Sequence, residues 1–138
     1  MDNKLGTLYI VSTPIGNLND ITNRAIEILN KVDVCAAEDT RNSIKLFNAL
    51  NIKTKLISFH KFSEKSKTSG LIKQLLQGKD IAIISDAGTP LISDPGRYLV
   101  KESIAEGIQI VPIPGVTSVI TALSVSGFNI DNFKFFGF

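Results

Sequence analysis

Short apolar runs alternate with segments of helical periodicity along this 138-residue chain. The clearest run is Asp80–Ser85 (DIAIIS), which is nearly continuous in apolar residues and too short for a typical helix. Near-continuous apolar strands are typical of parallel sheets that helices cover on both faces. We therefore predict an α/β fold, namely a three-layer α/β/α sandwich with a mainly parallel sheet of about five strands.

The same patterns give approximate bounds for the elements. The expected strands are 8–12, 32–37, 56–59, 80–85, 108–112 and a final aromatic strand at 133–138. The expected helices are one that begins near residue 20, then 43–50, one from Ser63 to near Gly78, one from Asp94 to Gly107, and 116–126. Asn19 or Asp20 is the expected N-cap of the first helix. Asp94 followed by Pro95 predicts an N-cap and a first helical residue.

Composition excludes several classes of protein. With 43% hydrophobic and 20% charged residues, the chain is neither a disordered tail nor a collagen. A single cysteine, Cys35, cannot form an internal disulfide, and it lies mid-strand, where we expect a buried thiol. A single histidine, His60, leaves no cluster for zinc, so we expect no metal. Without an apolar run of about 18 residues we expect no membrane segment and a cytoplasmic location.

Three expected strand exits share one composition, in which proline and glycine stand beside hydroxyl or acidic residues. They are 12–18 (STPIGNL), 85–96 (SDAGTPLISDPG) and 112–118 (PIPGVTS). Glycine allows close backbone approach to a ligand, and proline stiffens the loop. Gly and Pro are also common in ordinary strand–helix turns, but three similar loops at successive strand exits favour a ligand cleft at the carboxyl ends of the strands.

Acidic residues follow the second expected strand in the segment Ala37–Arg41 (AEDTR). Glu38 or Asp39 could orient a substrate or act as a base. Alternatively, Asp39 or Thr40 is a helix N-cap and Arg41 forms a surface ion pair. The residues alone leave both interpretations open. Glycine-rich dinucleotide and P-loop signatures and a nucleophile elbow are absent from the sequence.

The densest basic stretch is 53–67, with five lysines, one glutamate and two phenylalanines among them. A nucleic-acid surface that combines phosphate contacts with base stacking has this composition. A strand end followed by a solvated helix start has it too. We expect His60, inside this stretch, to lie at the surface or to face RNA.

Taken in order, LYIVSTPIGNLNDIT, AAEDTR, SDAGTPLISDPG and PIPGVTS resemble the tetrapyrrole-methylase-type (class III) S-adenosylmethionine methyltransferases. The resemblance extends over essentially the whole chain, and within the family it is to a branch that acts on ribosomal RNA. It implies S-adenosyl-L-methionine as cofactor and 2′-O-methylation of a cytidine ribose in small-subunit (16S) ribosomal RNA. It also implies a homodimer for the full-length protein.

The resemblance assigns roles to residues as follows. The catalytic candidates are Glu38, Asp39 and Asp86, and the RNA contacts are Arg41 and Lys61. The cofactor-binding residues are Pro14, Gly16, Asp86, Ala87, Gly88, Thr89, Pro90, Pro114, Gly115, Thr117 and Ser118.

Family members are about twice as long as this chain. We therefore interpret residues 1–138 as an N-terminal domain whose C-terminal partner domain is absent here. Alone, it is expected to bind the cofactor weakly and to be inactive. Two alternatives remain: a methyltransferase of the same fold acting on a precorrin-type tetrapyrrole, and a non-catalytic RNA-binding module.

Overall fold

One parallel sheet organises the chain, whose structure is a computed structural model that describes residues 4–138. Within those residues five strands lie in the order β3–β2–β4–β1–β5. Their bounds are Thr7–Val11 (β1), Val34–Ala37 (β2), Lys55–Ser58 (β3), Ile81–Ile84 (β4) and Gln109–Ile113 (β5). The helices are Asn23–Lys31 (α1), Thr40–Ala49 (α2), Glu64–Leu76 (α3), Arg97–Ala105 (α4) and Ser118–Ser124 (α5), with a short 3-10 turn (η1) at Leu18–Asp20.

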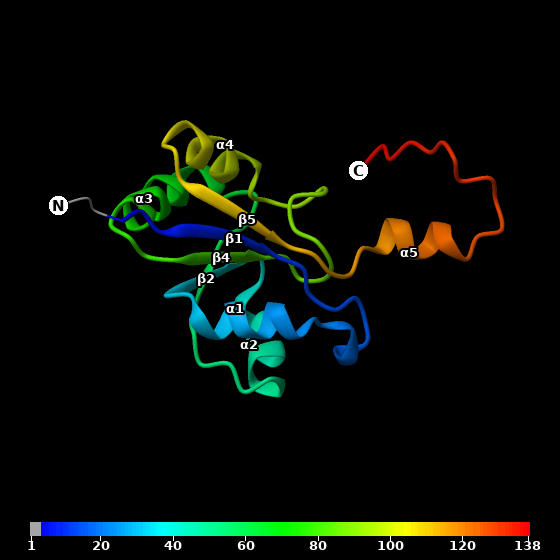
Figure 1. Cartoon of the computed structure of the whole chain (residues 1–138), viewed down its shortest axis with the longest axis horizontal. Helices are drawn as coiled ribbons and strands as arrows, with labels where there is room; N and C mark the ends of the chain where they lie inside the picture. The colour runs from blue at the N-terminus through cyan, green and yellow to red at the C-terminus, as the bar shows by residue number, and fades with distance from the viewer. Residues whose placement is uncertain (1–3) are drawn as a thin grey trace.

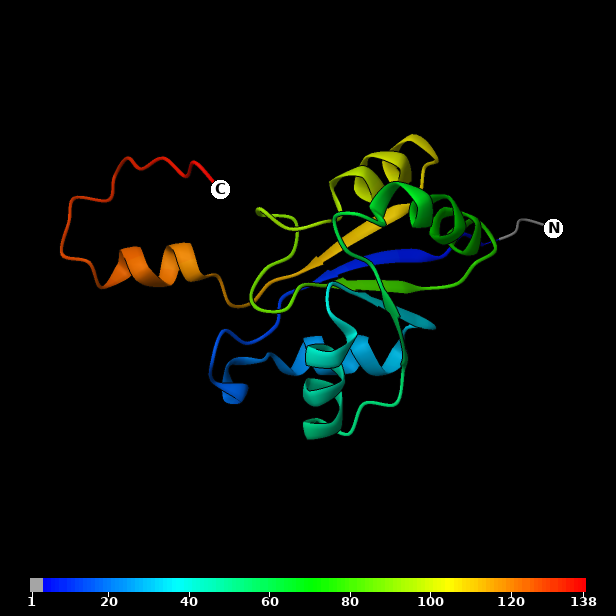
Figure 2. The same cartoon turned by 180° about the vertical axis from the view of Figure 1, so that it is seen from behind.

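Helices cover both faces of this sheet, which confirms the three-layer prediction. Figure 1 shows α3 and α4 on one face and α1 and α2 on the other, and Figure 2 shows the same layers from behind. β4, expected to be the clearest strand, lies in the middle and pairs with β2 and β1. Alternate residues serve the two cores: Ala82 and Ile84 pack with α1 and α2, while Ile81 and Ile83 pack with α3 and α4.

Cys35 is fully buried in β2, as expected, and burial strongly raises the pKa of its thiol. No helix within residues 4–138 is long and apolar enough to cross a bilayer.

Two helices begin at residues other than those expected. Asn17 caps η1, and α1 then begins behind Thr22, whose hydroxyl accepts a hydrogen bond from the Ala25 N–H at 3.0 Å. The prediction of Asn19 or Asp20 as its N-cap was therefore wrong, because those residues form the 3-10 turn. α2 begins at Thr40, three residues before the expected Ser43.

The start of α4 was also mispredicted, because a distant side chain caps it. Gly96, not Asp94, is the N-cap residue, and Arg97 is the first helical residue. The Glu64 carboxylate of α3 accepts hydrogen bonds from the Gly96 N–H at 3.0 Å and the Tyr98 N–H at 2.8 Å. Gly96 has φ +126°, and an added Cβ would lie 2.8 Å from Ile83 Cδ1, so only glycine fits there.

The segment that follows α5 does not join the sheet. Residues 133–138 were predicted to be a strand, but they have no regular secondary structure and are exposed. α5 carries the chain past the carboxyl edge of the sheet, and the end of the chain then curls back (Figure 1). Apolar character alone does not make a strand, because a strand needs a neighbour with which to exchange backbone hydrogen bonds.

We predict that Glu64→Ala lowers the free energy of unfolding by about 1–2 kcal/mol, because two N–H groups at the start of α4 lose their acceptor. Glu64→Gln should lose less, since its amide oxygen still accepts. Urea denaturation measures both changes. Glu27→Ala, on the exposed side of α1, is the control and should stay within about 0.5 kcal/mol of the parent. Equal losses for Glu64→Ala and Glu27→Ala would refute this capping role.

Candidate active site

Three loops meet at the carboxyl ends of β4, β1 and β5, which are neighbours in the sheet. Beyond the strands, Thr13 and Gly88 exchange two backbone hydrogen bonds of 3.0 and 2.9 Å. The Thr89 hydroxyl donates to the Val116 carbonyl oxygen at 2.9 Å and is 2.8 Å from the Ser12 hydroxyl. Because its proton is used on Val116, Thr89 accepts from Ser12. The sequence prediction that these loops come together is confirmed.

A cavity of about 310 Å³, here called the loop cavity, lies between the second and third of these loops. Its lining residues are Ala87, Gly88, Thr89, Ile92, Ser93, Asp94, Thr117, Ser118, Val119, Phe135, Gly137 and Phe138. Five of the predicted cofactor residues are therefore in its wall. The remaining ones (Pro14, Gly16, Asp86, Pro90, Pro114 and Gly115) lie on the same three loops but outside this wall. Gly115 lines a neighbouring hollow together with Ile15 and Thr117.

Sequence reasoning missed the part of the wall that Ile92, Ser93 and Asp94 supply. The sequence offered one sign, because the Ser-Asp pair of residues 85–86 is repeated at residues 93–94, but Asp94 was interpreted as a helix cap. Leu91 and Ser93 adopt φ +77° and +62°. Such φ values cost energy in residues other than glycine and are concentrated at functional sites.

Carboxylates from two loops gather beside the loop cavity. The Asp39 N–H donates a hydrogen bond of 3.1 Å to the Asp86 carboxylate, which ties the loop after β2 to the loop after β4. Burial, then the negative charges of Asp94 and Asp86, raise the pKa of Glu38. Burial and the charge of Asp86 likewise raise the pKa of Asp94. Glu38 therefore holds its proton at higher pH than an ordinary surface glutamate.

Asp39 is in a different situation, although it is adjacent to Glu38 in sequence. Its carboxylate accepts from the Arg41 N–H at 2.9 Å and from the Arg41 guanidinium at 3.1 and 2.9 Å. These hydrogen bonds and the Arg41 charge lower the pKa of Asp39. Of the two interpretations left open by the sequence, the structure shows the N-cap with an ion pair for Asp39. Glu38 forms no ion pair with Arg41.

A second cavity, here called the β2–β3 cavity, lies where β2 and β3 end side by side. It measures about 390 Å³ and is lined by Glu38, Asp39, Thr40, Arg41, Ser58 and His60. Arg41, predicted to contact RNA, is in this wall with its side chain 88% exposed. Lys61, the other predicted RNA contact, is exposed on the loop after β3. Within residues 4–138 there is no group of three or more His, Cys, Asp or Glu residues arranged to hold a metal ion.

Known proteins resemble this chain over nearly its whole length. The family model described as Tetrapyrrole (Corrin/Porphyrin) Methylases matches residues 7–135. A protein named ribosomal RNA small subunit methyltransferase I from Vibrio cholerae is 53% identical over 95% of this chain and 46% of its own length. Its namesake from Halalkalibacterium halodurans is 51% identical over 96% of this chain and 46% of its own length. This chain thus spans about half the length of these curated relatives.

A solved structure shares the fold. The uroporphyrin-III-C-methyltransferase from Thermus thermophilus has a TM-score of 0.69 and 24% sequence identity to this chain, and the match covers 92% of this chain and 55% of that one.

The opposite pKa shifts predict opposite effects on stability. The folded state disfavours the charged form of Glu38, so stability is lost as pH rises from the usual glutamate pKa through the raised value. Glu38→Gln should therefore raise the urea midpoint at pH 7, and the gain should vanish in acid. The folded state favours charged Asp39, so Asp39→Asn should lower the midpoint at pH 7, and that loss should disappear below the lowered pKa. Shifts of the same sign at pH 7 would contradict this electrostatic description.

Proposed function

The chain belongs to the tetrapyrrole (corrin/porphyrin) methylase family, and from this premise we propose that it supplies the N-terminal half of an S-adenosyl-L-methionine-dependent RNA methyltransferase. Its substrate is the ribose 2′-hydroxyl of a cytidine in small-subunit (16S) ribosomal RNA. The observation that carries the proposal is the identity of 51–53%, over nearly the whole chain, to proteins named ribosomal RNA small subunit methyltransferase I. The tetrapyrrole-methylating protein shares the fold at only 24% identity, which favours RNA over a tetrapyrrole.

The lining of the loop cavity fits a cofactor that carries an amino acid on a nucleoside. Asp94 offers a carboxylate for an ammonium group, and Ser93, Thr117 and Ser118 offer hydroxyl groups. Ile92 and Val119 offer apolar contact for a ring system. When bound, S-adenosyl-L-methionine supplies an electrophilic methyl group on a sulfonium. The residues of this chain would hold it in place, with the Thr13–Gly88 bridge fixing the position of the wall.

Positioning is the main task of such a site, because in-line approach of the nucleophile to the methyl group supplies much of the rate enhancement. A ribose hydroxyl is a poor nucleophile, so a carboxylate that accepts its proton adds about 10²–10⁴-fold. Among Glu38, Asp39 and Asp86, the arrangement favours Glu38, whose raised pKa brings it closer to the operating pH. Asp39 is the weakest candidate, because the Arg41 guanidinium occupies its carboxylate.

We further propose that a C-terminal domain completes the cofactor pocket and that the full-length protein is a cytoplasmic homodimer. Two observations support a missing partner surface: the chain spans about half of its relatives, and aromatic side chains of residues 128–138 are exposed. Several large apolar side chains exposed in one short segment are typical of contact sites. Calorimetric titration of the 138-residue chain with S-adenosyl-L-methionine should then show weak binding or none. A stop codon directly after residue 138 in the gene, together with tight cofactor binding, would refute the two-domain proposal.

The catalytic proposal is tested on the complete product of the gene by single-turnover transfer of a radiolabelled methyl group to small ribosomal subunits. Glu38→Gln should slow transfer by about 10²–10⁴-fold. Asp39→Asn should have a much smaller effect, and Asp86→Asn serves as the third comparison. Wild-type rates in all three variants would show that none of these carboxylates acts as a general base. If the parent protein transferred methyl groups to a precorrin and not to small ribosomal subunits, the proposal of an RNA substrate would be wrong.

A further inference from the structure

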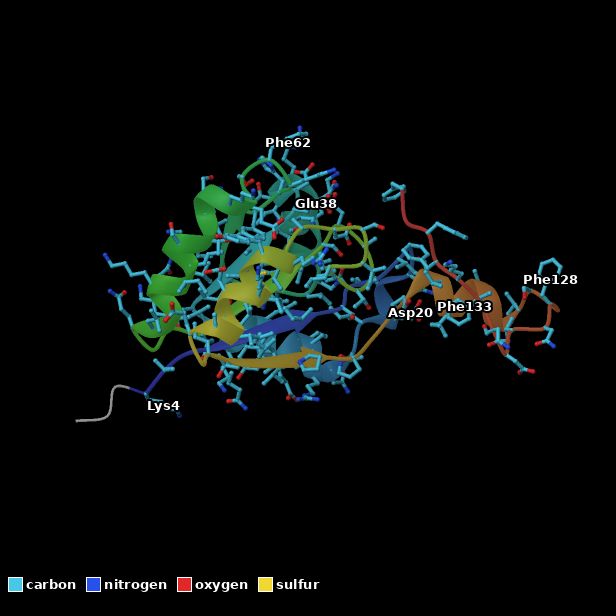
Figure 3. The ribbon with its side chains drawn as sticks, turned by 90° about the horizontal axis from the view of Figure 1, so that it is seen from above. Lys4, Asp20, Glu38, Phe62, Phe128 and Phe133 are labelled. Atoms are coloured by element: carbon cyan, nitrogen blue, oxygen red, sulfur yellow. The ribbon has the colours of Figure 1, made fainter. Side chains whose placement is uncertain are left out.

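The loop between β3 and α3, residues 59–63, places an exposed aromatic ring beside a half-buried imidazole. The Phe62 side chain is 94% exposed. Its ring lies edge-on to that of His60, with the centroids 6.2 Å apart and the planes at 63°. Figure 3 shows Phe62 at the rim of the molecule, on the same side as Glu38. An isolated phenylalanine gains nothing by projecting into water, so this ring is available to a partner.

Local hydrogen bonds hold this loop in place. The His60 N–H donates to the Ser63 hydroxyl at 3.1 Å, and the Ser63 N–H donates to the His60 carbonyl oxygen at 2.9 Å. The Lys67 ammonium donates to the Ser58 carbonyl at the end of β3. A ring presented on such a closed turn loses little conformational freedom when a ligand packs against it.

The imidazole of His60 carries an unused polar atom. His60 Nδ1 is buried and has no hydrogen-bond partner among the described residues. Buried polar groups nearly always have a partner, so an atom left without one behind a cavity wall points to a bound water, or to a ligand that it meets when the imidazole turns toward the cavity. The cavity in question is the β2–β3 cavity, where Thr40 and Ser58 add hydroxyl groups.

Charge narrows the class of ligand. Glu38 and Asp39 line the cavity and would repel a phosphate inside it, while the Arg41 guanidinium supplies donors at its edge. An uncharged ring with both donors and acceptors on its edge suits this wall, and a carboxylate is a good acceptor for an exocyclic amine. Outside the cavity, Lys61 and Lys65 are exposed next to Phe62 and suit flanking phosphates.

We propose that the β2–β3 cavity and Phe62 together form a receptor for one unpaired nucleobase of an RNA strand. The base stacks on Phe62, and its polar edge meets the Arg41 guanidinium and, when the imidazole turns toward the cavity, His60 Nδ1. Lys61 and Lys65 bind the adjacent phosphates. This inference rests on the proposed RNA substrate and adds where the strand is held. Sequence-specific RNA recognition mostly uses unpaired bases, which are commonly stacked on aromatic side chains. Glu38 lines the receptor and is close enough to Asp86 and Asp94 for their charges to raise its pKa, so the receptor adjoins the candidate catalytic carboxylates.

The test measures binding of the 138-residue chain to short fluorescein-labelled oligo(rC) by fluorescence anisotropy. Phe62→Ala should weaken binding about 5-fold to about 150-fold, the range for loss of one base–aromatic stack. Phe62→Tyr should retain most of the affinity, since it keeps the ring. The matched control is Phe128→Ala: that side chain is 80% exposed and lies far from Phe62, at the right-hand end of the molecule in Figure 3. Its affinity should be unchanged.

The salt dependence of RNA affinity distinguishes residues that contact phosphates from residues that contact the base. Lys61→Ala should reduce the slope of log affinity against log salt by about 1, because one phosphate contact is lost. Phe62→Ala and His60→Ala should lower affinity at every salt concentration and leave the slope unchanged. Circular dichroism checks that each variant is folded, and double-stranded RNA as competitor should displace oligo(rC) poorly.

Three results would overturn the receptor: no binding of oligo(rC) by the parent chain, unchanged affinity in Phe62→Ala, or equal losses in Phe62→Ala and Phe128→Ala. Competition by an acidic peptide as strong as that by oligo(rC) would point to a protein partner instead and would also overturn it. These outcomes are independent of the methyl-transfer assay. RNA methylation by the complete protein with unchanged Phe62→Ala binding would refute the receptor alone, and Phe62-dependent RNA binding without methyl transfer would refute the enzyme alone.

Discussion

Two backbone hydrogen bonds between Thr13 and Gly88 join the loops that leave β1 and β4. They form an antiparallel bridge just past the point where the parallel pairing of β1 and β4 ends. Gly88 accommodates this with φ +82°, and the next residue, Thr89, carries the side chain that reaches both Ser12 and Val116. The bridge and the Thr89 hydrogen bonds together join the three loops into one wall of the loop cavity.

The carboxylates next to this wall lower the stability of the fold while providing candidate catalytic groups. Glu38, Asp86 and Asp94 are close enough for their charges to raise the pKa of Glu38, which a fold selected for stability alone would avoid. Asp39 shows the opposite solution one residue away, because Arg41 neutralises it and the α2 N–H group uses it as a cap. Two adjacent acidic residues therefore have different roles: Asp39 fixes the start of a helix, and Glu38 is a carboxylate of raised pKa beside the cavity.

The two cavities share this carboxylate edge. The loop cavity draws its walls from the loops after β4 and β5, and the β2–β3 cavity from the ends of the two strands on the other side of β4. In a parallel sheet all strands end at the same edge, so sites built from different loops become neighbours. A cofactor in one cavity and a nucleotide in the other would meet near Glu38, which is the arrangement that a methyl transfer requires.

The sequence by itself determined the layered α/β fold, the parallel strands, the meeting of the three proline- and glycine-rich loops, and the burial of Cys35. These follow from hydrophobic periodicity and turn chemistry, which act over a few residues. Tertiary contacts alone decided that Glu64 caps α4 from another helix and that Asp94 lines a cavity. They also decided that, within residues 4–138, segment 133–138 pairs with no strand and His60 Nδ1 has no hydrogen-bond partner. Each of these depends on which atoms from distant parts of the chain become neighbours, and local residue patterns do not predict such long-range contacts.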